Sequence, residues 1–126
     1  MKTVFGAVVL MAIMIAVGVF VQNKMAEDAE YMAALMQQLE GAVLQDRFEE
    51  AEVIMSHVEH QWELARRVWS LIVDHSEMDY IKDSLVRLRG YIRSGDRQMS
   101  LVELSAAKYF VGHVRQKEAF SIESVF

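Results

Sequence analysis

The sequence predicts an all-α protein, with an N-terminal transmembrane helix followed by an antiparallel bundle of three to four helices. Three observations lead to this fold class. The 126 residues include no proline and only six glycines, while 53% of them are hydrophobic, so long stretches carry no turn signal. An uncharged apolar run opens the chain, and apolar residues after it recur at helical spacing. A chain of this length has room for one domain.

The opening run, Thr3 to Asn23, has the length of one membrane span. It contains no charged residue, and as a helix it would extend about 30 Å, the thickness of a bilayer's hydrocarbon core. Lys2 precedes the run and acidic residues follow it closely, so the positive-inside rule favours an internal N-terminus and an extracytoplasmic body. We expect an uncleaved anchor over residues 1–24 and a bundle domain over 25–126, in a single-pass protein of the cell membrane. A cleaved signal peptide and a buried soluble helix are the alternatives.

After the run, the predicted first helix continues into the body of the protein. Apolar residues recur in steps of four and three, as one face of a helix requires, at Met25, Ala29, Met32, Met36, Leu39 and Val43. Gly41 and the polar residues 45–47 predict the end of this helix. We expect the methionines to pack in the core, although soft methionine side chains also suit adaptable binding surfaces.

The second predicted helix has the clearest pattern in the chain. Two interleaved series recur every seven residues, at Phe48, Met55, Trp62 and Trp69, and at Ala51, Val58, Ala65 and Ile72. The pattern predicts a helix of roughly thirty residues, about 40 Å long. Further apolar residues widen its face enough to contact two neighbours, namely Ile54, Leu64, Val68 and Leu71. Trp62 and Trp69 face the same way, and we expect both to be interaction residues of the core.

Two more helices complete the predicted bundle. The third carries Met78, Ile81, Leu85, Leu88 and Ile92 on one face. It ends at Gly95, and Asp96 is expected to cap the next helix. The fourth runs from about Arg97 to Phe120, before a tail that restarts at Ser121, and it turns inward Leu101, Leu104, Ala107, Val111 and Val114. Gly90 and Gly112 inside these helices suggest close helix–helix approach, because glycine otherwise weakens a helix.

Composition also limits the chemistry. Without cysteine there are no disulfides, thiolate zinc sites or cysteine nucleophiles. The net charge is −5, but residues 27–63 hold ten acids and one base, whereas residues 64–126 hold ten bases and eight acids. Opposite charges on the two halves favour their antiparallel pairing, with solvated charged faces as the alternative.

A polar cluster, Asp74 to Asp79, suggests either a site or a corner between helices. Consecutive helical side chains project about 100° apart, so His75 and Ser76 cannot form a nucleophile and base on one surface. The corner interpretation explains more. His75 would lie at a helix C-terminus, where the partial negative charge favours a protonated ring, and Ser76 with Asp79 would open the next helix. We therefore interpret these residues as structural.

Two weaker alternatives concern metal and lipid. His57 and His60 lie one helical turn apart, and with Glu63 they could hold a zinc ion for a metal-dependent hydrolase, although no Glu-x-x-His motif occurs. Arg87, Arg89 and Arg93 could bind an anion or anionic lipid, although pairing of these arginines and Arg97 with the acidic first half is the preferred interpretation.

From Leu39 onward the chain resembles an uncharacterised domain-of-unknown-function family of small single-span helical membrane proteins from Gram-positive spore-forming bacteria. The residues that carry the resemblance are Asp46, Phe48 and Ala51, the pair Trp62 and Trp69, and the run "LIVDHSEMD" from Leu71 to Asp79. Phe48 replaces a tryptophan of the family, and Ser124 an asparagine. The resemblance implies no activity and no catalytic residues. It does imply a membrane-protein partner, because family members are often encoded beside a multi-span protein of the YetF type.

We therefore expect a membrane-anchored interaction or scaffold protein of the cell envelope that binds another membrane protein. No enzymatic activity, cofactor or nucleic-acid binding is expected, and a homo-oligomer is compatible with the pattern. The hydrolase and the lipid sensor remain the alternatives.

Overall fold

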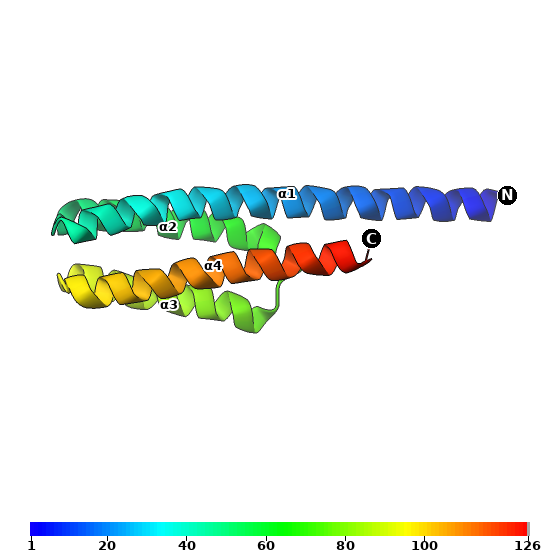
Figure 1. Cartoon of the computed structure of the whole chain (residues 1–126). Coiled ribbons are helices and arrows are strands. Elements are labelled where there is room, and N and C mark those ends of the chain that lie inside the picture. The colour runs from blue at the N-terminus through cyan, green and yellow to red at the C-terminus, as the bar shows by residue number, and fades with distance from the viewer. Residues whose placement is uncertain (126) are drawn as a thin grey trace.

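The computed structural model describes the backbone of residues 1–125 and all of their side chains except those of 115 and 118–125. Four helices account for almost all of the described chain: α1 (Lys2–Leu44), α2 (Phe48–Trp69), α3 (His75–Arg93) and α4 (Arg97–Val125). They run antiparallel in sequence and form a bundle, from which the N-terminal half of α1 projects (Figure 1). The predicted all-α fold class, with a long apolar N-terminal helix before a bundle, is confirmed.

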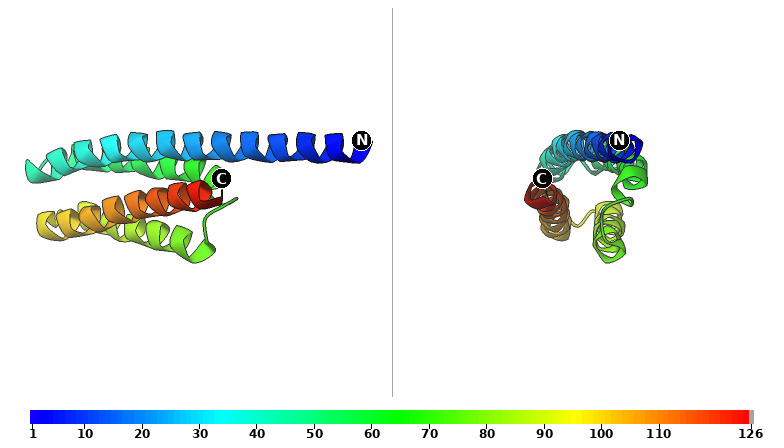
Figure 2. Two further views of the ribbon diagram at one scale, coloured as in Figure 1. Left: turned by 45° about the vertical axis from the view of Figure 1, so that its right-hand side comes forward. Right: turned by 90° about the vertical axis from the view of Figure 1, so that its right-hand side faces the viewer.

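The helices are arranged as a ring in which each contacts two neighbours. The packed pairs are α1 with α2, α2 with α3, α3 with α4 and α4 with α1, as the end-on view in Figure 2 shows. Of the four interfaces, the one between α2 and α3 is the least extensive. This loose seam leaves a groove on one side of the bundle.

Helix α1 consists of an exposed apolar N-terminal half and a C-terminal half packed in the bundle, with no break between them. It is the one described helix that is long and apolar enough to cross a membrane. Its large apolar side chains are exposed as far as Phe20, and its buried positions begin at Val21. The predicted stripe from Met25 to Val43 is buried throughout. The helix ends at Leu44, close to the predicted residues, and Asp46 takes a positive φ of 58° in the turn.

Helix α2 is shorter than predicted, at 22 residues or about 33 Å. The chain tightens after Trp69, where the amide of Leu71 donates to the carbonyl of Val68 and that of Ile72 to Trp69, each three residues back. The heptad pattern continues through Ile72, but the helix does not, so Leu71 and Ile72 lie in the connecting segment and are exposed. The expectation that Leu64 and Leu71 widen a buried face was also wrong, because Leu64 is exposed.

Trp62 and Trp69 are both buried, as predicted, and their rings pack edge to face with centroids 5.8 Å apart. The five predicted apolar residues of α3 are buried, and so are Leu104, Ala107, Val111 and Val114 of α4. Edge-to-face packing of large rings is favourable beyond the area that it buries. The tryptophan pair is therefore a central part of the α2 contribution to the core.

The turn between α3 and α4 has the predicted chemistry. Gly95 adopts φ 70°, a region that costs an L side chain energy, and the amide of Met99 donates to Asp96 Oδ1 over 3.0 Å, as in an N-cap. Two predictions were wrong. Helix α4 continues past Phe120 to Val125, so no separate tail begins at Ser121. A Cβ on Gly90 or Gly112 would meet no atom within 4 Å, so neither glycine marks a close helix contact.

Candidate interaction groove between α2 and α3

Two adjoining hollows, of about 320 and 220 Å³, follow the seam between α2 and α3. They share Trp62, Glu63 and Lys82, so we treat them as one groove. The first hollow is also lined by Glu59, Leu85, Val86, Arg89, Gly90 and Arg93. The second is also lined by Arg66, Ser70, His75, Met78 and Asp79.

Trp62 forms part of the groove lining and of the core. Its side chain is only 4% exposed, and its indole N–H has no acceptor among the described atoms. The same is true of the N–H of Trp69, which packs against it. A buried donor without an acceptor is uncommon in folded proteins. Both indole nitrogens are buried, so the groove presents the apolar part of Trp62 and not its N–H donor.

In the first hollow the two sides of the groove carry opposite charge, whereas the second hollow has Arg66 on the α2 side and Asp79 on the α3 side. Glu59 and Glu63 line the α2 side, whereas Lys82, Arg89 and Arg93 line the α3 side. A partner with bases along one edge and acids along the other would complement both sides, and such complementarity fixes orientation and partner choice. The first hollow is thus polarised across its width.

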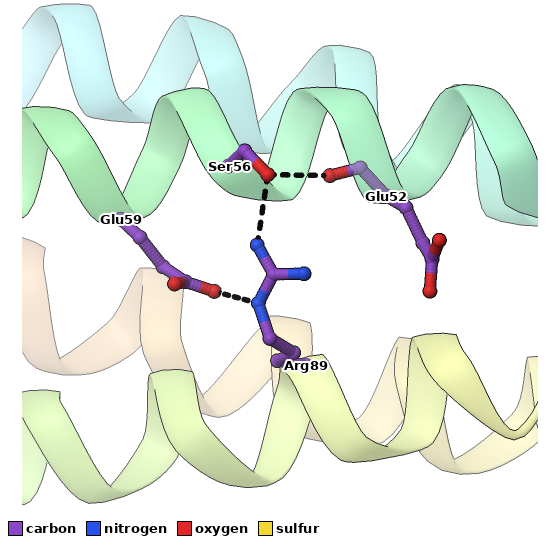
Figure 3. Close-up of polar contacts among 4 residues, drawn as sticks. All are labelled: Glu52, Ser56, Glu59 and Arg89. Carbon is purple, nitrogen blue, oxygen red and sulfur yellow. Dashed lines mark hydrogen bonds and ion pairs between the residues drawn. The ribbon is translucent and has the colours of Figure 1, made fainter.

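Arg89 crosses the seam and links the two helices (Figure 3). Its Nε donates to Glu59, and its Nη2 donates to Ser56 Oγ over 2.9 Å. Ser56 in turn donates to the carbonyl oxygen of Glu52, 3.1 Å away. This network holds α2 and α3 together at the groove end nearer the α3–α4 turn.

Glu63 stays charged through its neighbours. Arg66 Nε donates to Glu63 Oε2 over 2.8 Å. This hydrogen bond, with the positive charges of Arg66, Lys82 and Arg67, lowers the pKa of Glu63 below its ordinary value. The groove therefore keeps an acidic side in mildly acidic solution.

The structure does not gather the predicted metal ligands. His57 and His60 are exposed, and Glu63 is held by Arg66. Within residues whose side chains are described, no group of three His, Asp or Glu side chains is placed to hold a metal ion. The arrangement gives no support to a hydrolase centred on His57 and His60.

The Asp74–Asp79 cluster is a helix corner, but its details differ from the prediction. Asp74 is the N-cap residue of α3, without a side-chain capping bond, and Ser76 lies inside the helix. The predicted start at Ser76 was therefore wrong by two residues. His75 is the first residue of α3 rather than a residue at the end of α2, so the argument from a helix C-terminus does not apply. His75 and Asp79, one turn apart, line the second hollow.

The arginines of α3 turn to different neighbours. Arg87 Nε donates to Glu103 Oε1 on α4 over 2.8 Å, whereas Arg89 contacts α2. Arg93 lines the groove as the last residue of α3, and this end of α3 lies away from the projecting half of α1 (Figure 1). These residues form no single anion-binding face. Cross-helix ion pairs instead join the acidic first half to the second half through Arg89 with Glu59 and Lys108 with Glu40.

Sequence reasoning missed Lys82, Val86 and Gly90 as groove residues. They lie four residues apart on one face of α3, beside the buried stripe. Val86 is 64% exposed, although it is apolar and falls within a helix. The sequence did contain one signal for the groove. Val86 is an apolar residue with a lysine four residues before it and a glycine four residues after it on the same helical face.

The fold and groove define a class: a helical bundle with an open seam, whose first helix is long and apolar enough to cross a membrane. Residues 19–125 match the model of a domain of unknown function, DUF4363, and the chain belongs to this family. The match confirms the expected membership of an uncharacterised domain-of-unknown-function family. No curated protein and no solved structure matches the chain.

Proposed function

We propose that the protein is a membrane-anchored interaction protein, whose α2–α3 groove binds a helix of another membrane protein. The observation that carries this proposal is the groove itself, which has Trp62 in its lining and is polarised across its first hollow. The proposed function requires no cofactor.

The anchor is supported by the surface of α1. Its large apolar side chains from Val4 to Phe20 are 39–72% exposed. A continuous apolar surface of this extent is unfavourable in water and suited to lipid. Helical geometry satisfies the backbone hydrogen bonds within the segment, as a bilayer requires.

A helical partner fits the shape and charge of the groove. Leu85, Val86 and Trp62 offer apolar contacts along the seam, and an amphipathic helix presents apolar residues at matching intervals. Bases on one flank of that helix would face Glu59 and Glu63, and acids on the other would face α3. The anchor places the groove beside other membrane proteins, which favours a partner from the same membrane.

Site-specific photo-crosslinking in native membranes tests this proposal. A photoreactive residue is placed at Val86 in the groove and, as the matched control, at Val102 on α4, which is 55% exposed. We expect position 86 alone to crosslink one membrane protein, through a peptide that maps to an amphipathic helix. Arg93→Glu should reduce the yield about tenfold, the effect of losing ~1.4 kcal/mol of binding.

Three outcomes would overturn the proposal. Equal products from both positions would show non-specific proximity. A crosslink to a second copy of this chain would make the groove a homodimer contact. A product unaffected by Arg93→Glu would remove the role of the polarised side.

Orientation is a separate part of the proposal, in which the N-terminus is cytoplasmic and the bundle extracytoplasmic. The chain has no cysteine, so Gln98→Cys introduces a single thiol at an exposed position near the α3–α4 turn. Labelling of intact cells by a membrane-impermeant maleimide is expected. Labelling only after lysis would reverse the orientation.

A further inference from the structure

The segment between α2 and α3, Ser70 to Asp74, exposes two large apolar side chains. Leu71 is 73% exposed and Ile72 is 39% exposed, while Val73 is buried. This α2–α3 connection lies at the end of the bundle from which the N-terminal half of α1 projects (Figures 1 and 2). The exposed pair therefore points to a contact at that end.

The position of the α2–α3 connection relative to a bilayer can be estimated from the α1 residues beside it. Ile72 shares a hollow of about 360 Å³ with five residues of α1: Ile13, Met14, Val17, Gly18 and Val21. All five belong to the uncharged run, and Lys24 is the first charged residue after it. At about 1.5 Å per residue, the five residues lie between about 5 Å (Val21) and about 16 Å (Ile13) from Lys24 along the helix. Ile72 therefore lies beside residues that a spanning α1 places inside the bilayer.

We propose that the α2–α3 connection is a second membrane contact, with Leu71 and Ile72 inserted into the bilayer boundary and lipid acyl chains filling the hollow against α1. The proposal rests on the anchor in the proposed function, and goes beyond it. Interfacial segments bury apolar side chains about 5–10 Å into this boundary, which matches the shallower part of the hollow, beside Val17 and Val21.

The backbone of the connection is suited to this environment. Irregular backbone is excluded from lipid when its polar groups lack partners. Here the amides of Leu71, Ile72 and Val73 donate to carbonyls of α2, over 3.1, 3.1 and 2.8 Å. The three amides nearest the lipid thus have partners within the protein.

The charged neighbours favour a shallow position. Arg67 lies in the last turn of α2, where its long side chain can reach phosphate groups while its stem stays near the apolar boundary. Asp74 is exposed at the start of α3 and stays at headgroup level. The α2–α3 connection lies at the same depth as part of the α1 span. This shared depth, together with the exposed apolar side chains, favours lipid as the occupant of the hollow.

Single-cysteine variants of the full chain test the proposal in reconstituted vesicles of phosphatidylcholine and phosphatidylglycerol. Leu71→Cys reports on the connection, Val9→Cys on the apolar run, and Gln98→Cys on the opposite end of the bundle. Each thiol carries an environment-sensitive fluorophore. Quenching is compared between iodide in solution and lipids that carry a spin label just below the headgroup.

We expect the probe at position 71 to be quenched by the shallow spin-labelled lipid and protected from iodide, and the probe at position 98 to show the reverse. If position 9 is protected by the bilayer while position 71 behaves like position 98, the second contact is refuted and the anchor stands. If position 9 is itself open to iodide, the anchor fails, and the second contact with it. Leu71 is largely exposed, so its replacement leaves the bundle fold intact.

Discussion

Replacing Trp69 by alanine should be among the most destabilising single changes in the bundle. The side chain has no exposed surface, and it packs edge to face on Trp62 at 5.8 Å. Truncating a buried tryptophan costs about 3–5 kcal/mol through lost transfer energy and the cavity left behind. Of this, about 0.5–1.5 kcal/mol belongs to the ring pair, so it should reappear as the coupling energy of a double-mutant cycle with Trp62→Ala.

Urea unfolding of the full chain in mild detergent measures this effect. Far-UV circular dichroism follows the bundle, while detergent protects the apolar half of α1. With an m-value of about 1–3 kcal/mol per M, Trp69→Ala should lower the unfolding midpoint by at least about 1 M. Val53→Ala is the matched control, because Val53 is 60% exposed on the same helix and should change stability by less than about 0.5 kcal/mol. A cost below about 1 kcal/mol for Trp69→Ala would refute the role given to the pair.

Three other predictions use smaller changes. Gly95→Ala should destabilise the bundle by about 1 kcal/mol because of its positive φ, whereas Gly112→Ala, in open helical space, should stabilise it by about 0.5–1 kcal/mol in the same urea assay. Glu103→Ala should cost about 1–3 kcal/mol, since a buried serine and an arginine lose their shared acceptor, and an unchanged midpoint would contradict this. Arg66→Ala should raise the pKa of Glu63 toward its ordinary value in an NMR titration, because the hydrogen bond that favours the carboxylate is removed.

The helical core follows closely from the sequence because burial in a bundle imposes a helical period on apolar residues. The stripe from Met25 to Val43 is buried as predicted, and so is the pair Trp62 and Trp69. The turn at Gly95 was equally predictable, since its positive φ calls for glycine. Each of these features depends on local spacing or local backbone chemistry.

The end of α2 and the groove were not predictable in the same way. Ile72 continues the heptad pattern, but apolarity indicates only that a residue avoids water, and here its neighbour is the exposed half of α1. Gly90 was expected to mark close packing, yet in the structure its missing side chain helps to leave a hollow. The end of α2 and the groove both depend on the distances between helices. The periodicity of apolar residues in a single sequence does not specify those distances.

The continuity of α1 has a mechanical consequence. The helix passes from the apolar run into the bundle with no proline, and no hinge separates the two parts. In the proposed membrane-anchored protein, any tilt or rotation of the span would therefore be transmitted directly to the bundle. From Lys24 to Leu44 the helix rises about 30 Å, which would limit how far the α3–α4 turn can stand from the bilayer. The proposed partner would then have to present its helix within that height, so the length of α1 would restrict which membrane proteins can reach the groove.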